Sequence, residues 1–156
     1  MKVEIKPGAI LTHAKLTNAN LTGADLTNAN LNWAHLPKAN LKGADLFSAN
    51  LTGADLRFAN LTKADLRDAD LYNAILYDAN LYGANLEGAD LAGANLPNAN
   101  LKGADLHSAN LTDADLTGAN LTGVKFPTGY GKLPVEEKET AEPILRGGQT
   151  LREEDE

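Results

Sequence analysis

The sequence predicts an all-β solenoid, a four-sided parallel β-helix, and three observations support this prediction. Leu occupies every fifth position from Leu11 to Leu121 without a gap, 23 times in succession. Ala stands two positions before each of these Leu residues, from Ala9 to Ala119. Only 5% of the residues are aromatic, so the core must be built from two repeated side-chain shapes, which is typical of repeat proteins.

The repeated unit has the form Ala-(Asn/Asp)-Leu-x-x and occurs 24 times across residues 9–128, with Val124 and Phe126 in the Ala and Leu places of the last unit. A period of five fits neither an α-helix nor a flat strand. The chain must therefore turn after each unit. We expect Ala and Leu to point inward, and the Asn or Asp between them to point outward.

The last two positions of each unit indicate the kind of turn. Gly or Asn recurs in the last position, as at Gly23 and Asn28, and Pro precedes that position at Pro37, Pro97 and Pro127. Pro favours the first central position of a type II turn, and Gly or Asn tolerates the positive φ of the second. Four such corners close a square, so four units make one predicted coil. The six predicted coils are 9–28, 29–48, 49–68, 69–88, 89–108 and 109–128.

Each predicted coil has four sides, and residues 20 apart in the sequence form a column along the rod. The first, second, third and fourth sides begin in the first coil at Ala9, Ala14, Ala19 and Ala24. Successive coils should hydrogen-bond like parallel strands, about 4.8 Å apart.

Both ends of such a rod need a cap, because they expose apolar core and unpaired backbone. In residues 1–8, the apolar Val3 and Ile5 alternate with charged residues and are followed by a Pro-Gly pair. This pattern predicts a short N-terminal cap. The repeat stops after Thr128. We expect residues 129–156 to form a C-terminal cap followed by an acidic, mobile tail.

Units such as ANLTGADL resemble those of the pentapeptide-repeat family, and the resemblance covers 120 of the 156 residues. It implies a right-handed quadrilateral β-helix and a protein of the cyanobacterial type. Family members with known roles bind proteins, and they include DNA mimics that act on gyrase and a regulator of heterocyst differentiation. The resemblance therefore implies an interaction role, without naming a partner.

Composition and charge narrow the function classes. The chain has no Cys, which excludes disulfides and thiolate metal sites. Its net charge of −7 argues against direct nucleic-acid binding, because phosphate contacts require clustered Lys and Arg. No apolar run reaches the length of a signal peptide or membrane span. We expect a cytoplasmic monomer, rather than a dimer, with no membrane contact and no cofactor.

The three histidines, His13, His35 and His107, occupy different positions of their units. They should therefore form neither a metal site nor a catalytic dyad.

Two outward columns contain repeated polar residues. Asp25, Asp45, Asp65 and Asp105 share a column on the fourth side, interrupted by Asn85. This column could hold cations or imitate phosphates, but we favour hydrogen bonds from these carboxylates to the local backbone. The corresponding column on the third side is an Asn ladder, for which we expect a structural role. Its members are Asn20, Asn40, Asn60, Asn80, Asn100 and Asn120.

The second side departs from the repeat around the middle of the rod. Its outward column reads Lys15, His35, Asp55, Ile75, Asn95, Asp115, with Ile75 in a place that is otherwise polar. Phe58, Tyr72 and Tyr77 lie at or beside the same side, and Arg57 should lie one coil below Tyr77, in range for a cation–π contact. These five residues, Arg57, Phe58, Tyr72, Ile75 and Tyr77, are the candidate protein-interaction patch. Large corner side chains could alternatively just cover neighbouring backbone, although aromatic residues and Arg are enriched at interface centres.

The leading functional hypothesis is a non-enzymatic module that presents a rigid surface to a protein partner. An enzyme needs a cleft with converging titratable groups, and a rod filled with side chains is not expected to offer one. The alternative is an acidic DNA mimic that acts on DNA gyrase. Residues 9–128 contain 12 acidic and eight basic residues, a net charge of −4 that is modest for imitating a duplex.

Overall fold

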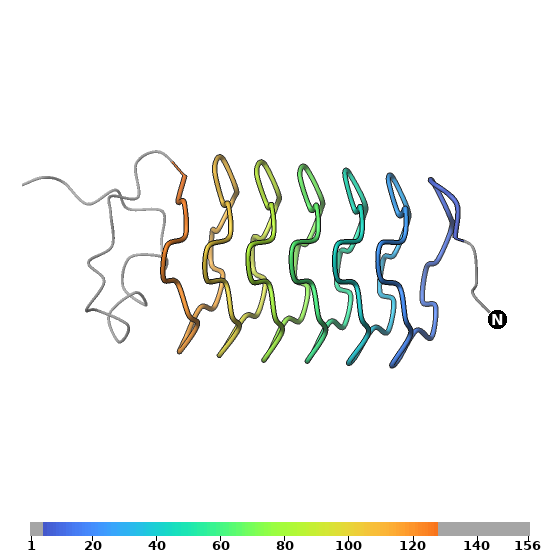
Figure 1. Ribbon diagram of the computed structural model, residues 1–156, viewed down its shortest axis with the longest axis horizontal. Helices are drawn as coiled ribbons and strands as arrows, with labels where there is room; N and C mark the ends of the chain where they lie inside the picture. Colours follow the sequence, from blue (N-terminus) through green and yellow to red (C-terminus); the bar gives the residue numbers. More distant parts are fainter. Residues whose placement is uncertain (1–4, 128–156) are drawn as a thin grey trace, which may run out of the picture.

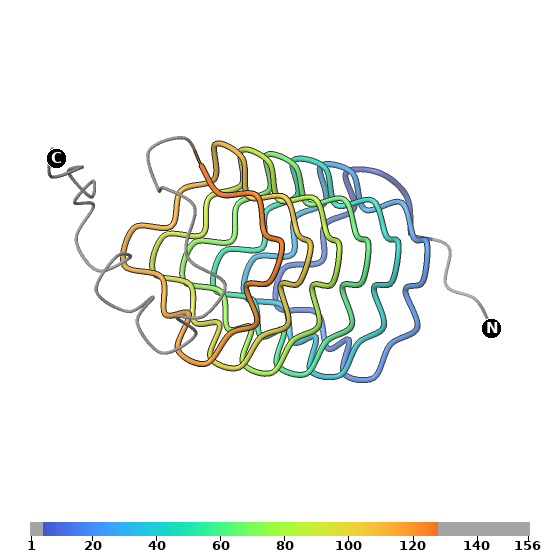
Figure 2. The same ribbon diagram turned by 60° about the vertical axis from the view of Figure 1, so that its left-hand side comes forward.

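The computed structural model describes residues 5–127, which wind into a β-helical solenoid (Figure 1). Parallel β-bridges join residues 20 apart, from Ile10–Asn30 to Asp105–Lys125. Each bridge is one residue wide, and residues 5–127 form no helix and no longer strand. In a turned view the coils lie one behind another along a common axis (Figure 2). The bridges agree with the predicted coil length, whereas the number of six coils and the right-handed sense stay predictions.

Every unit ends in a tight turn. The Ala amide that follows each turn donates to the carbonyl of the preceding Leu, as from Ala14 N to Leu11 O at 2.9 Å. The residue in the last position of each unit, directly before this Ala, has a positive φ. Its values lie between 53° and 70° at every corner from His13 to Gly123. These features are what the predicted type II turns require.

Hydrogen bonds between coils use three of the five amides in each unit of the middle of the rod. In the unit 49–53, Leu51 N donates to Asp70 O at 2.7 Å, Gly53 N donates to Tyr72 O at 2.8 Å, and Asn50 N donates back to Ala29 O at 2.9 Å. A fourth amide closes the turn. Only the amide of the fourth residue has no backbone acceptor in this pattern, so its partner must be a side chain or water.

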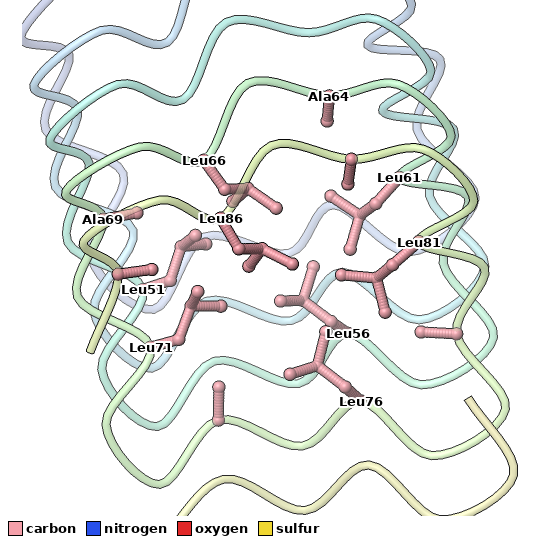
Figure 3. Packing of buried hydrophobic residues seen from close by; sticks show 14 of the residues in the cluster. Leu51, Leu56, Leu61, Ala64, Leu66, Ala69, Leu71, Leu76, Leu81 and Leu86 are labelled. Atoms are coloured by element: carbon pink, nitrogen blue, oxygen red, sulfur yellow. The ribbon is translucent and has the colours of Figure 1, made fainter. Parts of the chain in front are cut away.

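The Leu and Ala side chains point inward and fill the interior (Figure 3). From Leu26 to Leu111, no Leu of the repeat is more than 1% exposed. A fully buried Leu contributes about 2 kcal/mol to stability. The predicted inward phase of Ala and Leu is confirmed.

The N-terminal end is only partly covered by the described residues. Ile5 packs against the core, and Gly8 N donates to Thr27 O at 2.7 Å. Leu11 and Leu16 remain half-buried. Residues 1–4 of the predicted cap, Thr128, and the predicted C-terminal cap and tail at 129–156 lie outside the described residues.

Residues 5–127 include no helix that is long and apolar enough to cross a membrane.

Because Leu points inward and the next residue points outward, the same substitution at these two positions should have different effects on stability. Leu61→Asp should abolish cooperative folding, because Leu61 is fully buried and an unpaired carboxylate there costs several kcal/mol beyond the lost packing. Thr62→Asp, one residue on and facing outward, should leave the thermal unfolding transition nearly unchanged. Circular dichroism melts of the two variants test this, and equal effects would mean that the inward phase is wrongly assigned.

Candidate functional site

The outward Asn and Asp side chains bind the one amide of each unit that the backbone leaves without an acceptor. Asp25 Oδ1 accepts from Thr27 N at 3.1 Å, and Asp45 Oδ1 accepts from Phe47 N at 3.0 Å. The same bond to the residue two positions on is made by Asn20, Asn30, Asn40, Asn50, Asp55, Asn60, Asp65, Asp70, Asn80, Asn85, Asp90, Asn100, Asp105, Asn110, Asp115 and Asn120. This bond is therefore a regular element of the fold.

The Asp column of the fourth side follows this rule, which confirms the prediction of local backbone bonding. Two of its four carboxylates are also ion-paired, Asp65 with Arg67 at 2.6 Å and Asp105 with Lys125 at 2.8 Å. Within residues 5–127, no group of three or more His, Cys, Asp and Glu residues could hold a metal ion.

The Asn ladder of the third side makes the structural contacts expected of it. Asn60 Nδ2 donates to Asn40 Oδ1 at 3.3 Å, and Asn100 Nδ2 donates to Asn80 Oδ1 at 3.2 Å. These amides join neighbouring coils in addition to binding their own backbone.

Ile75 breaks the rule on the second side. Its side chain has no acceptor for the Tyr77 amide, and no residue in the described part of the chain supplies one. Ile10 and Lys15, near the N-terminal end, likewise offer no acceptor to the amide two residues on. At His35 and Asn95 the bond is missing for a different reason, because Pro37 and Pro97 have no N–H to donate. Ile75 is also 39% exposed. It therefore gives the fold neither the regular hydrogen bond nor a fully buried side chain.

The structure brings two residues of the candidate patch, Phe58 and Tyr77, into contact. Phe58 and Tyr77 lie in neighbouring coils, with ring centroids 5.7 Å apart in an edge-to-face arrangement at 86°. Tyr72 lies on the corner before the second side, in the same coil as Ile75, and all four side chains are exposed. Edge-to-face pairs are favourable by about 1 kcal/mol, so this aromatic pair is held in place.

The expected cation–π contact between Arg57 and Tyr77 is wrong. The Arg57 guanidinium binds Asp55 instead, with Nε to Oδ1 at 2.8 Å and Nη2 to Oδ2 at 2.7 Å. A bidentate bond to a carboxylate is stronger than a contact with an exposed ring, and Asp55 is only two residues away. A cation–π contact occurs on the fourth side, where Arg67 lies 5.5 Å from the Phe47 ring centre.

Asp55 is a buried acidic residue on an outward column. It is 8% exposed, and it is the only buried polar or charged residue among residues 5–127. The hydrogen bond from Arg57 holds the pKa of Asp55 below its usual value, although burial opposes this shift. Asp55 and Arg57 therefore form a fixed, charged pair at neutral pH.

Trp33, which the sequence reasoning missed, extends the apolar surface to the corner between the first and second sides. It is the only Trp of the chain and is 51% exposed. Its ring lies over Gly53, in the same column, so closely that a Cβ atom on Gly53 would collide with it. The signal in the sequence was a Trp in a turn position followed 20 residues later by a Gly.

Trp33 and Phe58 adopt a backbone conformation that does not suit bulky residues. Their φ angles are 55° and 59°, at positions where most other corners carry Gly, Asn, Asp or Ser. The left-handed region costs such side chains about 1–2 kcal/mol each. The contact with Gly53 shows that Trp33 does cover backbone, yet half of its surface stays exposed.

Comparison with protein families finds one match along most of the chain. A family model described as pentapeptide repeats, in eight copies, matches residues 8–43, 24–57, 49–88 and 84–123. The comparison with curated protein sequences finds no match.

Solved structures of pentapeptide repeat proteins are similar to this chain. Rfr23 from the cyanobacterium Cyanothece 51142 is 46% identical, with a TM-score of 0.58 over 59% of this chain and 63% of that chain. A pentapeptide repeat protein from the Arabidopsis thaliana thylakoid lumen is 37% identical, with a TM-score of 0.57 over 65% and 68% of the two chains.

HetL from Nostoc sp. strain PCC 7120, a protein involved in heterocyst differentiation regulation, is 40% identical over 76% of this chain and 62% of that chain, with a TM-score of 0.33. The matches therefore span less than two thirds of the lengths of Rfr23 and HetL.

The contact between Trp33 and Gly53 can be isolated by two matched substitutions. Gly53→Ala should lower the melting temperature and shift the Trp fluorescence to longer wavelength, because the new Cβ atom displaces the Trp33 ring. Gly43→Ala adds the same atom at nearly the same φ, 62° against 63°, with no atom within 4 Å. The control should therefore show only the backbone cost of about 1 kcal/mol and an unchanged Trp spectrum. Equal spectra for both variants would mean that Trp33 does not lie on Gly53.

Proposed function

Because the chain belongs to the pentapeptide repeat family, we propose that it is a non-catalytic module that binds a partner protein through the second side of its rod. The binding surface consists of Arg57, Phe58, Tyr72, Ile75 and Tyr77, here called the second-side patch. The proposal takes the rod to be the right-handed, four-sided helix of six coils that the sequence predicts.

Ile75 is the single observation that carries this proposal. It replaces an Asn or Asp that would accept the Tyr77 amide, and it leaves an apolar side chain exposed two residues before Tyr77, which packs on Phe58. A net hydrogen bond contributes about 1 kcal/mol, so the fold would be served better by the repeat consensus. Exposed apolar residues beside aromatic residues and Arg are typical of the centres of protein interfaces.

The predicted alternative, an acidic DNA mimic that acts on DNA gyrase, has weaker support. Its best candidate surface is the Asp column, where Arg67 and Lys125 pair with two of the four carboxylates. Pairing reduces the negative field that a mimic of DNA needs. A DNA supercoiling assay separates the two functions, because a gyrase-directed mimic changes supercoiling and a second-side binding module does not.

Ile75→Asn tests the proposed function. The variant restores the acceptor for the Tyr77 amide, so the melting temperature should stay the same or rise. Binding of the native partner, identified by affinity capture from the source cell, should weaken at least about tenfold, or 1.4 kcal/mol, the scale of a modest hot spot. Quantitative binding with the purified partner measures this.

Asn100→Asp, on the Asn ladder of the third side, is the control and should leave partner binding intact. If Ile75→Asn instead melts well below the parent and binds the partner undiminished, Ile75 packs for the fold and the proposed function is wrong.

A further inference from the structure

We propose that the outer edge of the Arg57 guanidinium is a carboxylate-binding site, and that the partner is a protein segment presenting an Asp or Glu side chain next to an apolar one. This inference rests on the proposed function, because it names the chemistry that the second-side patch recognises.

The geometry of the ion pair leaves half of the guanidinium available. Asp55 occupies the edge formed by Nε and Nη2. A guanidinium carries five N–H donors in a plane, so one donor on Nη2 and both donors on Nη1 remain. None of them has an acceptor among residues 5–127 in the structure, and the Arg57 side chain is 50% exposed. The edge formed by Nη1 and Nη2 can therefore bind a second carboxylate in the same plane.

Asp55 holds this edge in a fixed orientation. The carboxylate accepts two bonds from the guanidinium, and Oδ1 also accepts the Arg57 backbone amide at 3.2 Å. The Asp55 side chain is only 11% exposed, so its own position is set by its surroundings. An Arg that is already ordered loses less rotamer entropy on binding, which favours affinity.

The neighbours of Arg57 provide the apolar part of the site. Ile75 forms a β-bridge with Asp55, and so lies directly above it in the column. Phe58 follows Arg57 in the chain and packs edge-to-face on Tyr77. Apolar groups around a polar contact exclude water and strengthen it. The segment that fits this surface must therefore carry an apolar side chain close to its carboxylate.

The charges on this part of the second side favour an anion. Its units 14–18, 34–38, 54–58 and 74–78 contain the basic residues Lys15, Lys38 and Arg57 and the acidic residues Asp55 and Asp78, a net charge of +1. Lys38 lies in the column directly below Phe58, and its amide donates to Arg57 O at 2.9 Å. Arg57 balances the negative charge of Asp55. The remaining positive charge can attract an acidic segment.

Arg67 on the fourth side is an internal control for this argument. It binds Asp65 through the same two nitrogens, with Nε to Oδ1 at 2.9 Å and Nη2 to Oδ2 at 2.6 Å. However, its guanidinium lies against the Phe47 ring. The outward positions of the fourth side also carry the acidic residues Asp25, Asp45, Asp65, Asp68, Glu87 and Asp105. An acidic segment would be repelled there, so the same local pairing should not create a second binding site.

The test uses the full chain and an array of short fluorescent peptides in matched pairs. The two peptides of a pair differ only in a central Glu or Gln, placed between Leu residues, and their affinities are measured by fluorescence polarisation. The wild type should prefer the Glu peptides at least about tenfold, because a bidentate charge-assisted bond is among the strongest polar contacts. The Gln peptides keep the shape and the apolar neighbours.

Two conservative variants identify the group responsible. Arg57→Lys keeps the positive charge and can still pair with Asp55, but it has no second planar edge, so the Glu preference should fall to about twofold or less. Arg67→Lys makes the same change on the fourth side and should leave the preference unchanged. The melting temperature and the Trp33 fluorescence check that both variants fold.

The outcomes separate this inference from the proposed function. The inference is wrong if the wild type binds no peptide, if it shows no Glu preference, or if Arg57→Lys retains that preference. If Ile75→Asn nevertheless weakens binding of both peptides of a pair, the second-side patch remains a binding surface with another chemistry. The proposed function is decided separately, by whether Ile75→Asn weakens binding of the native partner.

Discussion

Hydrogen bonds between residues in neighbouring coils determine which way each side chain of the described repeat units points. Each bridge joins residues 20 apart, so a Leu must return to the same place on the rod after four units. The type II corners make this return possible, because each one redirects the chain within four residues. A stack of buried Leu and Ala then follows, and the stability of the rod is close to a sum over neighbouring coils.

Because of this constraint, the positions of each unit differ in how many residue types they tolerate. Ala and Leu are fixed by the interior, and the second position is constrained by the amide of the fourth residue, which nearly always needs an Asn or Asp acceptor. The remaining outward positions can vary with little effect on the fold. A departure at the second position, as at Ile75, is therefore more informative than a large side chain at a corner.

The five-residue period was enough to predict the inward phase, the positive φ corners and the local bonding of the Asp column, because these depend on contacts within one unit or between identical units. Contacts between different side chains were harder to predict. The predicted contact between Arg57 and Tyr77 was wrong, because the carboxylate of Asp55, two residues away in the sequence, binds the guanidinium better than a ring one coil away. Trp33 was missed because its partner is Gly53. The contact depends on the absence of a side chain at Gly53, and a glycine in a turn position does not by itself indicate such a contact.

The central claim is that Ile75 gives up a hydrogen bond that the fold uses elsewhere, and amide hydrogen exchange measured by NMR tests it most directly. Tyr72, Tyr77 and Tyr82 each follow a Leu in the same place of consecutive units, so their intrinsic exchange rates are comparable. Tyr72 N donates to Asp70 Oδ1 at 2.9 Å and Tyr82 N donates to Asn80 Oδ1 at 3.1 Å, whereas Ile75 offers Tyr77 no acceptor. We expect the Tyr77 amide to exchange at least about fivefold faster than the other two, as the loss of a bond of about 1 kcal/mol requires. Equal protection of all three amides would contradict the claim.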